Sequence, residues 1–157
     1  MTRTTFCVVC SLSIVPLALL AQTRMKPTAP GTSGDPVWQG VLKMADGRTF
    51  VTDGGLAIDA SLAKPAKLPD RVIPPKVMQD YLSVTNPNEY ALSDLSAAMS
   101  GKTYSTPNGV AMSATYINFL RRILPGGTAR LRVGEKRQPI VIVADGRAVG
   151  VLMPVAQ

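Results

Sequence analysis

Few side chains in this sequence could do chemistry, and its most prominent carboxylates fall in turns. Asp46, Asp53 and Asp145 each stand directly before a glycine. An aspartate at such a position accepts hydrogen bonds from the turn backbone, and this structural role is what the pattern predicts. Asp53 and Asp59 could in principle share a cation, but no acidic cluster with metal-ligand spacing accompanies them. We therefore expect turns here and no metal site.

Composition limits nucleophilic and metal chemistry further. The sequence has no histidine, and its two cysteines, Cys7 and Cys10, both lie close to the start. The remaining residues therefore lack the side chains for Cys/His or Ser/His/Asp catalysis and for zinc or haem ligation by His or Cys. The Cys-Val-Val-Cys spacing resembles a redox or metal pair, but it sits inside an apolar run without partner ligands.

Two further motifs resemble catalytic or nucleotide sites only in part. Residues 96–103, SAAMSGKT, approach a phosphate-binding loop. That loop needs glycine where Ser96 stands, and a helix where the turn-rich stretch YSTPNG follows. Ser100 and Lys102 could form a serine/lysine pair, but nothing in the sequence buries the lysine so that it acts as a base. These observations predict a protein that is not an enzyme and needs no cofactor.

The bulk composition indicates one folded, basic domain. A length of 157 residues is typical of a single domain, and 46% hydrophobic with 17% charged residues excludes a wholly disordered chain. The net charge of +7 favours acidic partners such as nucleic acid or an anionic membrane. The densest basic group consists of Arg121, Arg122, Arg130 and Arg132. This group is either a solvated face or a surface that follows a phosphate backbone without sequence specificity.

The first 24 residues are typical of a leader. A basic start, an apolar run over residues 6–20 and a cleavage point after Ala21 fit a secretory signal peptide, and the run is short for a membrane span. The alternative is a mis-assigned start, with Met25 as the first residue. Residues 25–36 are expected to be a flexible linker. We expect a cytoplasmic protein if the start is Met25 or the leader is uncleaved, and an exported or periplasmic one after cleavage near Ala21.

Residues 37–155 are expected to form one strand-rich domain with two short helices. Asp-Gly pairs between alternating runs predict hairpins, because glycine adopts the positive φ that such turns need. A short helix is expected within 72–84, and a longer one over 113–124 with Ser113 as its N-cap. Strands are expected at 37–44, 48–52, 56–62 and 128–134, and on both sides of the turn within 139–155. The apolar chain end, Met153-Pro154-Val155, is either a buried strand or the lip of a hydrophobic docking groove.

Three segments, in order, resemble the bacterial DNA polymerase III beta sliding clamp. Residues 48–62, RTFVTDGGLAIDASL, are similar to the clamp segment in which an Ala-Thr-Asp-Gly turn precedes a Leu-Ala strand. Residues 68–84, LPDRVIPPKVMQDYLSV, resemble the following stretch, where Val/Ile-Pro-Arg/Lys opens a short helix. Residues 112–155 resemble the C-terminal segment, which has a helix, an Arg-rich strand, a Pro-led strand and a closing Val-Met-Pro-Met-like strand.

The resemblance implies a fold. It predicts an α+β, DNA-clamp-like domain over residues 37–155, with two β-α-β-β-β-type copies and two short helices packed on antiparallel sheets. In the family the helices lie inside and the sheets outside a ring that surrounds DNA. Family members carry three domains in each chain, so a ring of single-domain chains would need more copies, and self-association is an expectation.

The resemblance also implies partners. These are duplex DNA, bound without sequence specificity by helix-borne cations, and replication or repair proteins that place short clamp-binding motifs in a hydrophobic pocket. The DNA-facing candidates on the two expected helices are Lys76, Arg121 and Arg122, and Arg130 and Arg132 of the basic group are added to them. The partner-pocket candidates are Thr52, Gly54, Leu56, Val151, Met153 and Pro154. The family's Thr-Asp-Gly-His-Arg-Leu-Ala segment is one residue shorter here, without its His and Arg. In the family, the turn and the C-terminal strand of the pocket come from successive domains.

Two functions follow as hypotheses. The first is a non-catalytic, sliding-clamp-like protein that associates with duplex DNA or docks replication and repair partners. The second is an exported small binding or scaffold protein that keeps the fold without a DNA role, and the leader is its main support.

Overall fold

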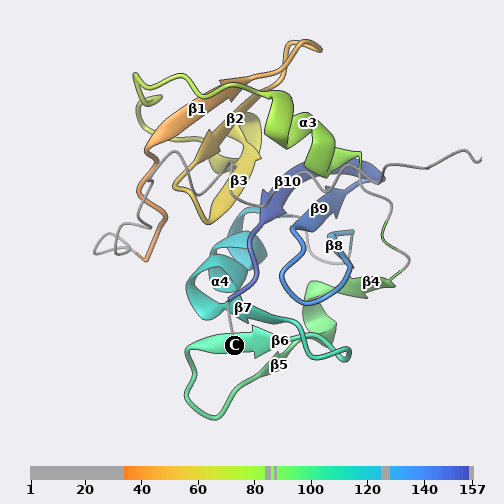
Figure 1. The fold of residues 1–157 in the computed structure, drawn as a ribbon. Coiled ribbons are helices and arrows are strands. Elements are labelled where there is room, and N and C mark those ends of the chain that lie inside the picture. Colours follow the sequence, from red (N-terminus) through yellow and green to blue (C-terminus); the bar gives the residue numbers. More distant parts are fainter. Residues whose placement is uncertain (1–33, 84–85, 87, 125–127, 156–157) are drawn as a thin grey trace, which may run out of the picture.

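The structure is a computed structural model that describes residues 34–83, 86, 88–124 and 128–155. The expected leader, residues 25–33 of the expected linker, and residues 125–127, where Pro-Gly-Gly is expected to end the helix over 113–124, lie outside the described residues. The fold is α+β, with one large antiparallel sheet, one small sheet and short helices (Figure 1).

The large sheet has seven strands in the order β1-β2-β3-β10-β9-β8-β4, and every neighbouring pair is antiparallel. At the centre of this sheet, β3 from the first part of the described chain pairs with β10 from its last part. The strands are β1 (Gly40–Lys43), β2 (Thr49–Thr52), β3 (Leu56–Asp59), β4 (Asn88–Ala91), β8 (Arg130–Val133), β9 (Ile140–Ala144) and β10 (Arg147–Leu152).

The small sheet has the order β5-β6-β7 and lies beside the last helix, below the large sheet in Figure 1. Its strands are β5 (Ser96–Ala97), β6 (Thr103–Ser105) and β7 (Ala111–Ser113). The helices are α2 (Ala60–Ala63), α3 (Lys76–Leu82) and α4 (Ala114–Ile123), with the 3-10 turn η1 (Leu92–Asp94).

The expected Asp-Gly hairpins are confirmed. The β9–β10 turn places Asp145 at φ 49° and Gly146 at φ 73°. Two consecutive positive φ values match the twist of antiparallel strands, which is why Asp-Gly is favoured there. The β1–β2 turn ends with Gly47 at φ 84°, and Met44 donates its N–H to the carbonyl of Arg48 at 2.8 Å. Local sequence therefore sets both hairpins.

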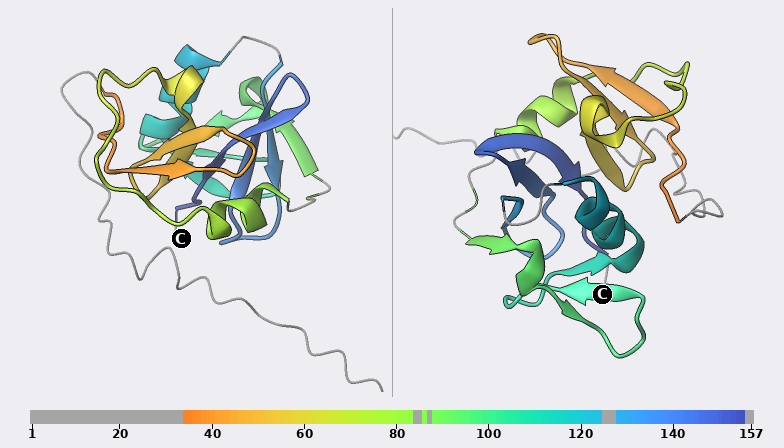
Figure 2. Two further views of the ribbon diagram at one scale, coloured as in Figure 1. Left: turned by 90° about the horizontal axis from the view of Figure 1, so that it is seen from above. Right: turned by 180° about the vertical axis from the view of Figure 1, so that it is seen from behind.

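The two longer helices cover opposite faces of the large sheet. Successive side chains of a strand point to opposite faces. Val151 packs with Met78 of α3, whereas Leu152, its neighbour in β10, packs with Ile117 and Leu120 of α4. Two views show α3 and α4 on either side of β10 (Figures 1 and 2).

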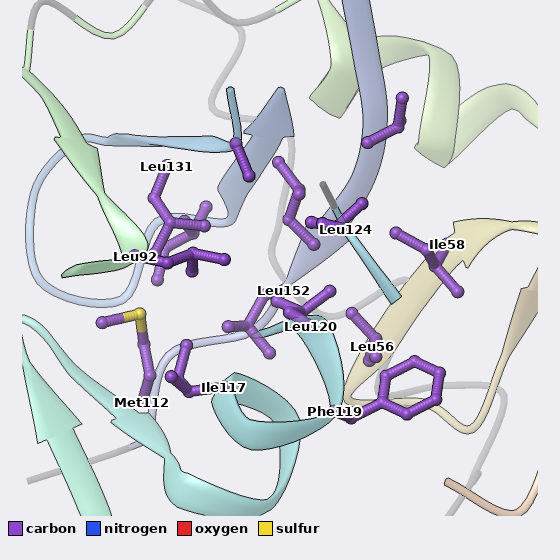
Figure 3. Close-up of a cluster of buried hydrophobic side chains, with 14 of the residues drawn as sticks. Leu56, Ile58, Leu92, Met112, Ile117, Phe119, Leu120, Leu124, Leu131 and Leu152 are labelled. Carbon is purple, nitrogen blue, oxygen red and sulfur yellow. The ribbon is translucent and has the colours of Figure 1, made fainter. Parts of the chain in front are cut away.

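The larger core lies on the α4 side. Leu120 of α4 lies beside Leu152 of β10 and Leu56 of β3 (Figure 3), and all three are almost fully buried. The helix expected over residues 113–124 is present as α4, and it meets the sheet with its apolar face. Ser113 occupies the N-cap position, as expected. Its side chain, however, makes no hydrogen bond to the helix. The Ala114 N–H donates instead to the carbonyl of Lys102 at 2.9 Å.

Candidate docking pocket

An apolar cavity of about 290 Å³ lies on the α3 side of the sheet. Its walls come from the Thr-Asp-Gly-Gly turn between β2 and β3, the first turns of α3, and the end of β10. The lining residues are Leu42, Thr52, Gly54, Gly55, Leu56, Ala57, Ile73, Pro74, Val77, Met78, Tyr81, Val151 and Met153.

The Thr-Asp-Gly-Gly turn is held by the side chain of Asp53, which is 1% exposed. One of its oxygens, Oδ1, accepts hydrogen bonds from the N–H groups of Gly55 and Leu56, both at 2.9 Å. The Gly54 N–H donates to Oγ1 of Thr52 at 3.0 Å, and Gly54 has φ 95°. Thus Asp53 has the structural turn role that its position before glycine predicts.

Helix α4, which covers the other face of the sheet, also supports this turn. The Tyr116 hydroxyl, on α4, donates a 2.8 Å hydrogen bond to Oδ2 of Asp53. Burial, reinforced by the nearby Asp53 carboxylate, raises the pKa of Tyr116 above its usual value. The phenol therefore stays protonated and remains a donor. Sequence reasoning missed this contact, because 63 residues separate its partners.

The α3 wall is built from side chains on one helix face. Val77 and Tyr81 are four positions apart and both line the cavity, with Met78 buried between them and the sheet. Burial also raises the pKa of Tyr81. The spacing of Val77 and Tyr81 in the sequence is typical of such a face. Pro75 directly precedes the helix, where its missing N–H is tolerated.

Most of the expected pocket residues are brought together. Thr52, Gly54, Leu56, Val151 and Met153 line the cavity. Pro154 is half-buried and is not one of the lining residues. The residues missing from the expected set include Gly55, Leu42, Ile73 and the apolar face of α3. The α3 periodicity was a usable signal for that face, whereas only the tertiary fold adds Leu42 from β1.

The two DNA-facing candidates at the end of α4 both contact other residues of this protein. Arg121 donates from Nη2 to the Leu92 carbonyl at 2.7 Å, and its guanidinium lies 4.5 Å from the Tyr104 ring centroid. Arg122 forms an ion pair with Asp35. Both arginines are nevertheless exposed.

The strand arginines and the α3 lysine are placed differently. Arg132 of β8 pairs with Glu89 of β4 at 2.5 Å. Arg130 is half-buried and donates from Nη1 to the Ala129 carbonyl at 3.3 Å. Lys76 is exposed at the start of α3, which covers the opposite sheet face from α4. The structure therefore does not bring Lys76 together with the α4 arginines.

The remaining candidates for chemistry have structural partners. Asp59 accepts hydrogen bonds at Oδ1 from the N–H and the hydroxyl of Ser61, at 2.9 and 2.7 Å, and so caps α2. Ser100 accepts a long 3.4 Å hydrogen bond from the Lys102 backbone, and both residues are exposed in the β5–β6 loop. Across the described ranges, no group of three or more His, Cys, Asp or Glu side chains could hold a metal ion.

Comparison of the sequence with protein-family models, with curated proteins and with solved structures finds no match. A search of the described part of the chain finds no helix that is long and apolar enough to cross a membrane.

Proposed function

We propose that this protein is a non-catalytic docking protein of the sliding-clamp type, whose pocket binds a short apolar segment of a partner protein. One observation carries the proposal. Five of the six residues that the clamp resemblance assigned to a partner pocket line a single apolar cavity, although they come from sequence regions about a hundred positions apart.

The chemistry of the cavity favours a peptide with apolar side chains. Its volume is at the small end of the range for ligand sites, and its walls are mostly aliphatic side chains and glycine backbone. Two large apolar side chains would fill such a space. Each contributes about 1.5–3 kcal/mol on full burial, and part of this is offset by ordering the peptide. We therefore expect a weak affinity, with a Kd between about 0.1 mM and several millimolar.

The element order supports the clamp-like part of the proposal. The C-terminal part runs β7-α4-β8-β9-β10, which is the β-α-β-β-β order. An isolated bridge between Val41 and Val72, followed by α3, β4, η1, β5 and β6, gives a partial counterpart in element order, in which β4 lies in the large sheet and β5 and β6 lie in the small one. The hairpins β1–β3 precede both, and they supply the turn side of the pocket. In this arrangement one chain contributes both walls that successive domains contribute in the clamp family.

The expected partners are replication or repair proteins with short clamp-binding motifs. Association with duplex DNA is the second part of the proposal, because Arg121 and Arg122 remain exposed at the end of α4. Their contacts with Leu92 and Asp35 would have to exchange for phosphate contacts. Such binding would be weak and salt-sensitive.

Peptide titration tests the docking proposal. The probe is a short fluorescent peptide with neighbouring leucine and phenylalanine side chains, and the control is the same peptide with alanine at those two positions. We expect saturable binding of the first peptide and at least tenfold weaker binding of the second. Equal binding of the two peptides, or no binding at millimolar concentration, would refute the proposal.

A further inference from the structure

The pocket wall at Gly55 rests directly on the side chain of Tyr116. A Cβ atom added to Gly55 would lie 2.5 Å from the Tyr116 hydroxyl oxygen and 3.0 Å from two ring carbons. Real Cβ atoms do not approach other atoms so closely, so glycine at this position permits the turn to sit against the ring. Gly55 lines the cavity, whereas Tyr116 does not.

Asp53 connects the same two parts by hydrogen bonds. Its Oδ2 accepts from the Tyr116 hydroxyl, and its Oδ1 accepts from the N–H groups of Gly55 and Leu56. The carboxylate is buried, so each of its oxygens needs a donor inside the protein. The Tyr116 hydroxyl therefore fixes the carboxylate, and the carboxylate fixes the backbone of two lining residues.

The connection continues to the opposite wall. The Gly55 carbonyl accepts a 2.8 Å hydrogen bond from the N–H of Met153, which also lines the cavity. A shift of the turn would therefore move the β10 side of the pocket as well.

We propose that Tyr116 is a positioning residue for the docking pocket: from α4, on the far face of the sheet, it sets the shape of the Gly55–Leu56 wall through Asp53. The expected effect of Tyr116 on peptide binding rests on the proposed function. The position of the turn in the free protein is a separate consequence, which can be measured without any peptide.

The test uses Tyr116→Phe, which keeps the ring and removes the hydroxyl. The matched control is Tyr104→Phe, which also removes a phenolic hydroxyl that contacts α4, since Tyr104 donates to Oδ1 of Asn118 at 3.3 Å. The first readout is the amide ¹H–¹⁵N shifts of Gly54, Gly55, Leu56 and Met153 in the free protein. The second is the affinity for the leucine/phenylalanine peptide.

We expect Tyr116→Phe to shift the four amides and to weaken peptide binding about tenfold, and Tyr104→Phe to change neither. Unchanged amides in Tyr116→Phe would overturn the inference, whatever the affinity does. Shifted amides with unchanged peptide affinity would overturn it as well, because the hydroxyl would then place the turn without shaping the pocket. If the wild type binds no peptide, the proposed function fails, and the amide shifts alone decide whether Tyr116 sets the wall.

Discussion

The backbone N–H of Met153 donates a 2.8 Å hydrogen bond to the carbonyl of Gly55. This bond joins the end of β10 to the Thr-Asp-Gly-Gly turn, and both residues line the same apolar cavity. It is possible because β3 and β10 are neighbours at the centre of the sheet, with Leu152 opposite Leu56. One short chain thereby assembles a two-walled pocket.

A charge placed in the pocket should weaken docking without harming the fold. Val77 is half-buried and lines the cavity, and it stands on the short helix α3. In Val77→Lys the ammonium group would lose water when a peptide enters, which is unfavourable without a partner. We expect at least tenfold weaker peptide binding by fluorescence anisotropy.

The matched control for that variant is Gln79→Lys, because Gln79 is exposed on the same helix and does not line the cavity. It should bind peptide as the wild type does. Equal weakening by both variants would mean that charge on α3, and not the cavity, governs the binding.

The contact between Gly55 and Tyr116 predicts non-additive effects on stability. Gly55→Ala should destabilise the protein by about 1–3 kcal/mol, as is usual for overpacking. In the Tyr116→Phe background the added methyl group no longer meets the hydroxyl, so its cost should be smaller by about 1 kcal/mol. Urea unfolding of the four proteins in this cycle measures the difference. A cycle with Tyr104→Phe should be additive, and an additive result for Tyr116 would contradict the contact.

The half-buried phenol of Tyr116 predicts a loss of stability in alkali. The pKa of Tyr116 is raised in the folded protein, while an unfolded tyrosine titrates near about 10. Below that pH both states keep the proton, and above it the unfolded state loses its proton first. The free energy of unfolding should therefore fall as the pH rises above about 10.

Tyr116→Phe should show a shallower fall in urea unfolding over that range. Some dependence should remain, because burial also raises the pKa of Tyr81. Identical pH dependence in the wild type and in Tyr116→Phe would contradict the raised pKa of the Tyr116 phenol.

The ion pair between Arg122 and Asp35 predicts how DNA affinity responds to a surface change. Asp35→Asn removes the carboxylate that pairs with Arg122, so that the Arg122 guanidinium can contact a DNA phosphate more readily. We expect duplex DNA to bind about two- to fivefold more tightly at low salt, in line with the modest strength of surface pairs. Asp70→Asn, which changes the net charge equally at an exposed Lys67 pair, is the control. An equal gain in both variants would assign the effect to net charge alone.

Local features of this fold could be predicted from the sequence. The Asp-Gly hairpins and the apolar stripe of α4 depend on residues close together in the chain, and the structure has both. The expectation that Thr52 and Val151 share one pocket came from the resemblance to the clamp family. Nothing in the local sequence indicates that β3 and β10 pair.

Other features could not be predicted because they depend on tertiary contacts. The small sheet β5-β6-β7 is built from strands of only two or three residues, which are too short to show a clear alternation. The placement of α3 and α4 on opposite faces depends on which side of β10 each meets. The hydrogen bond between Tyr116 and Asp53 and the ion pair between Arg122 and Asp35 both join residues far apart in sequence, so periodicity could not reveal them.

The most direct test of the docking claim is methionine methyl NMR of the protein during titration with the leucine/phenylalanine peptide. Met78 and Met153 line the cavity, whereas Met112 is buried in the opposite core and Met99 is fully exposed, so the chain contains its own controls. We expect saturable shifts of the Met78 and Met153 methyl signals, with Met112 and Met99 unchanged. Saturable binding that leaves the Met78 and Met153 signals unmoved would contradict docking in this cavity.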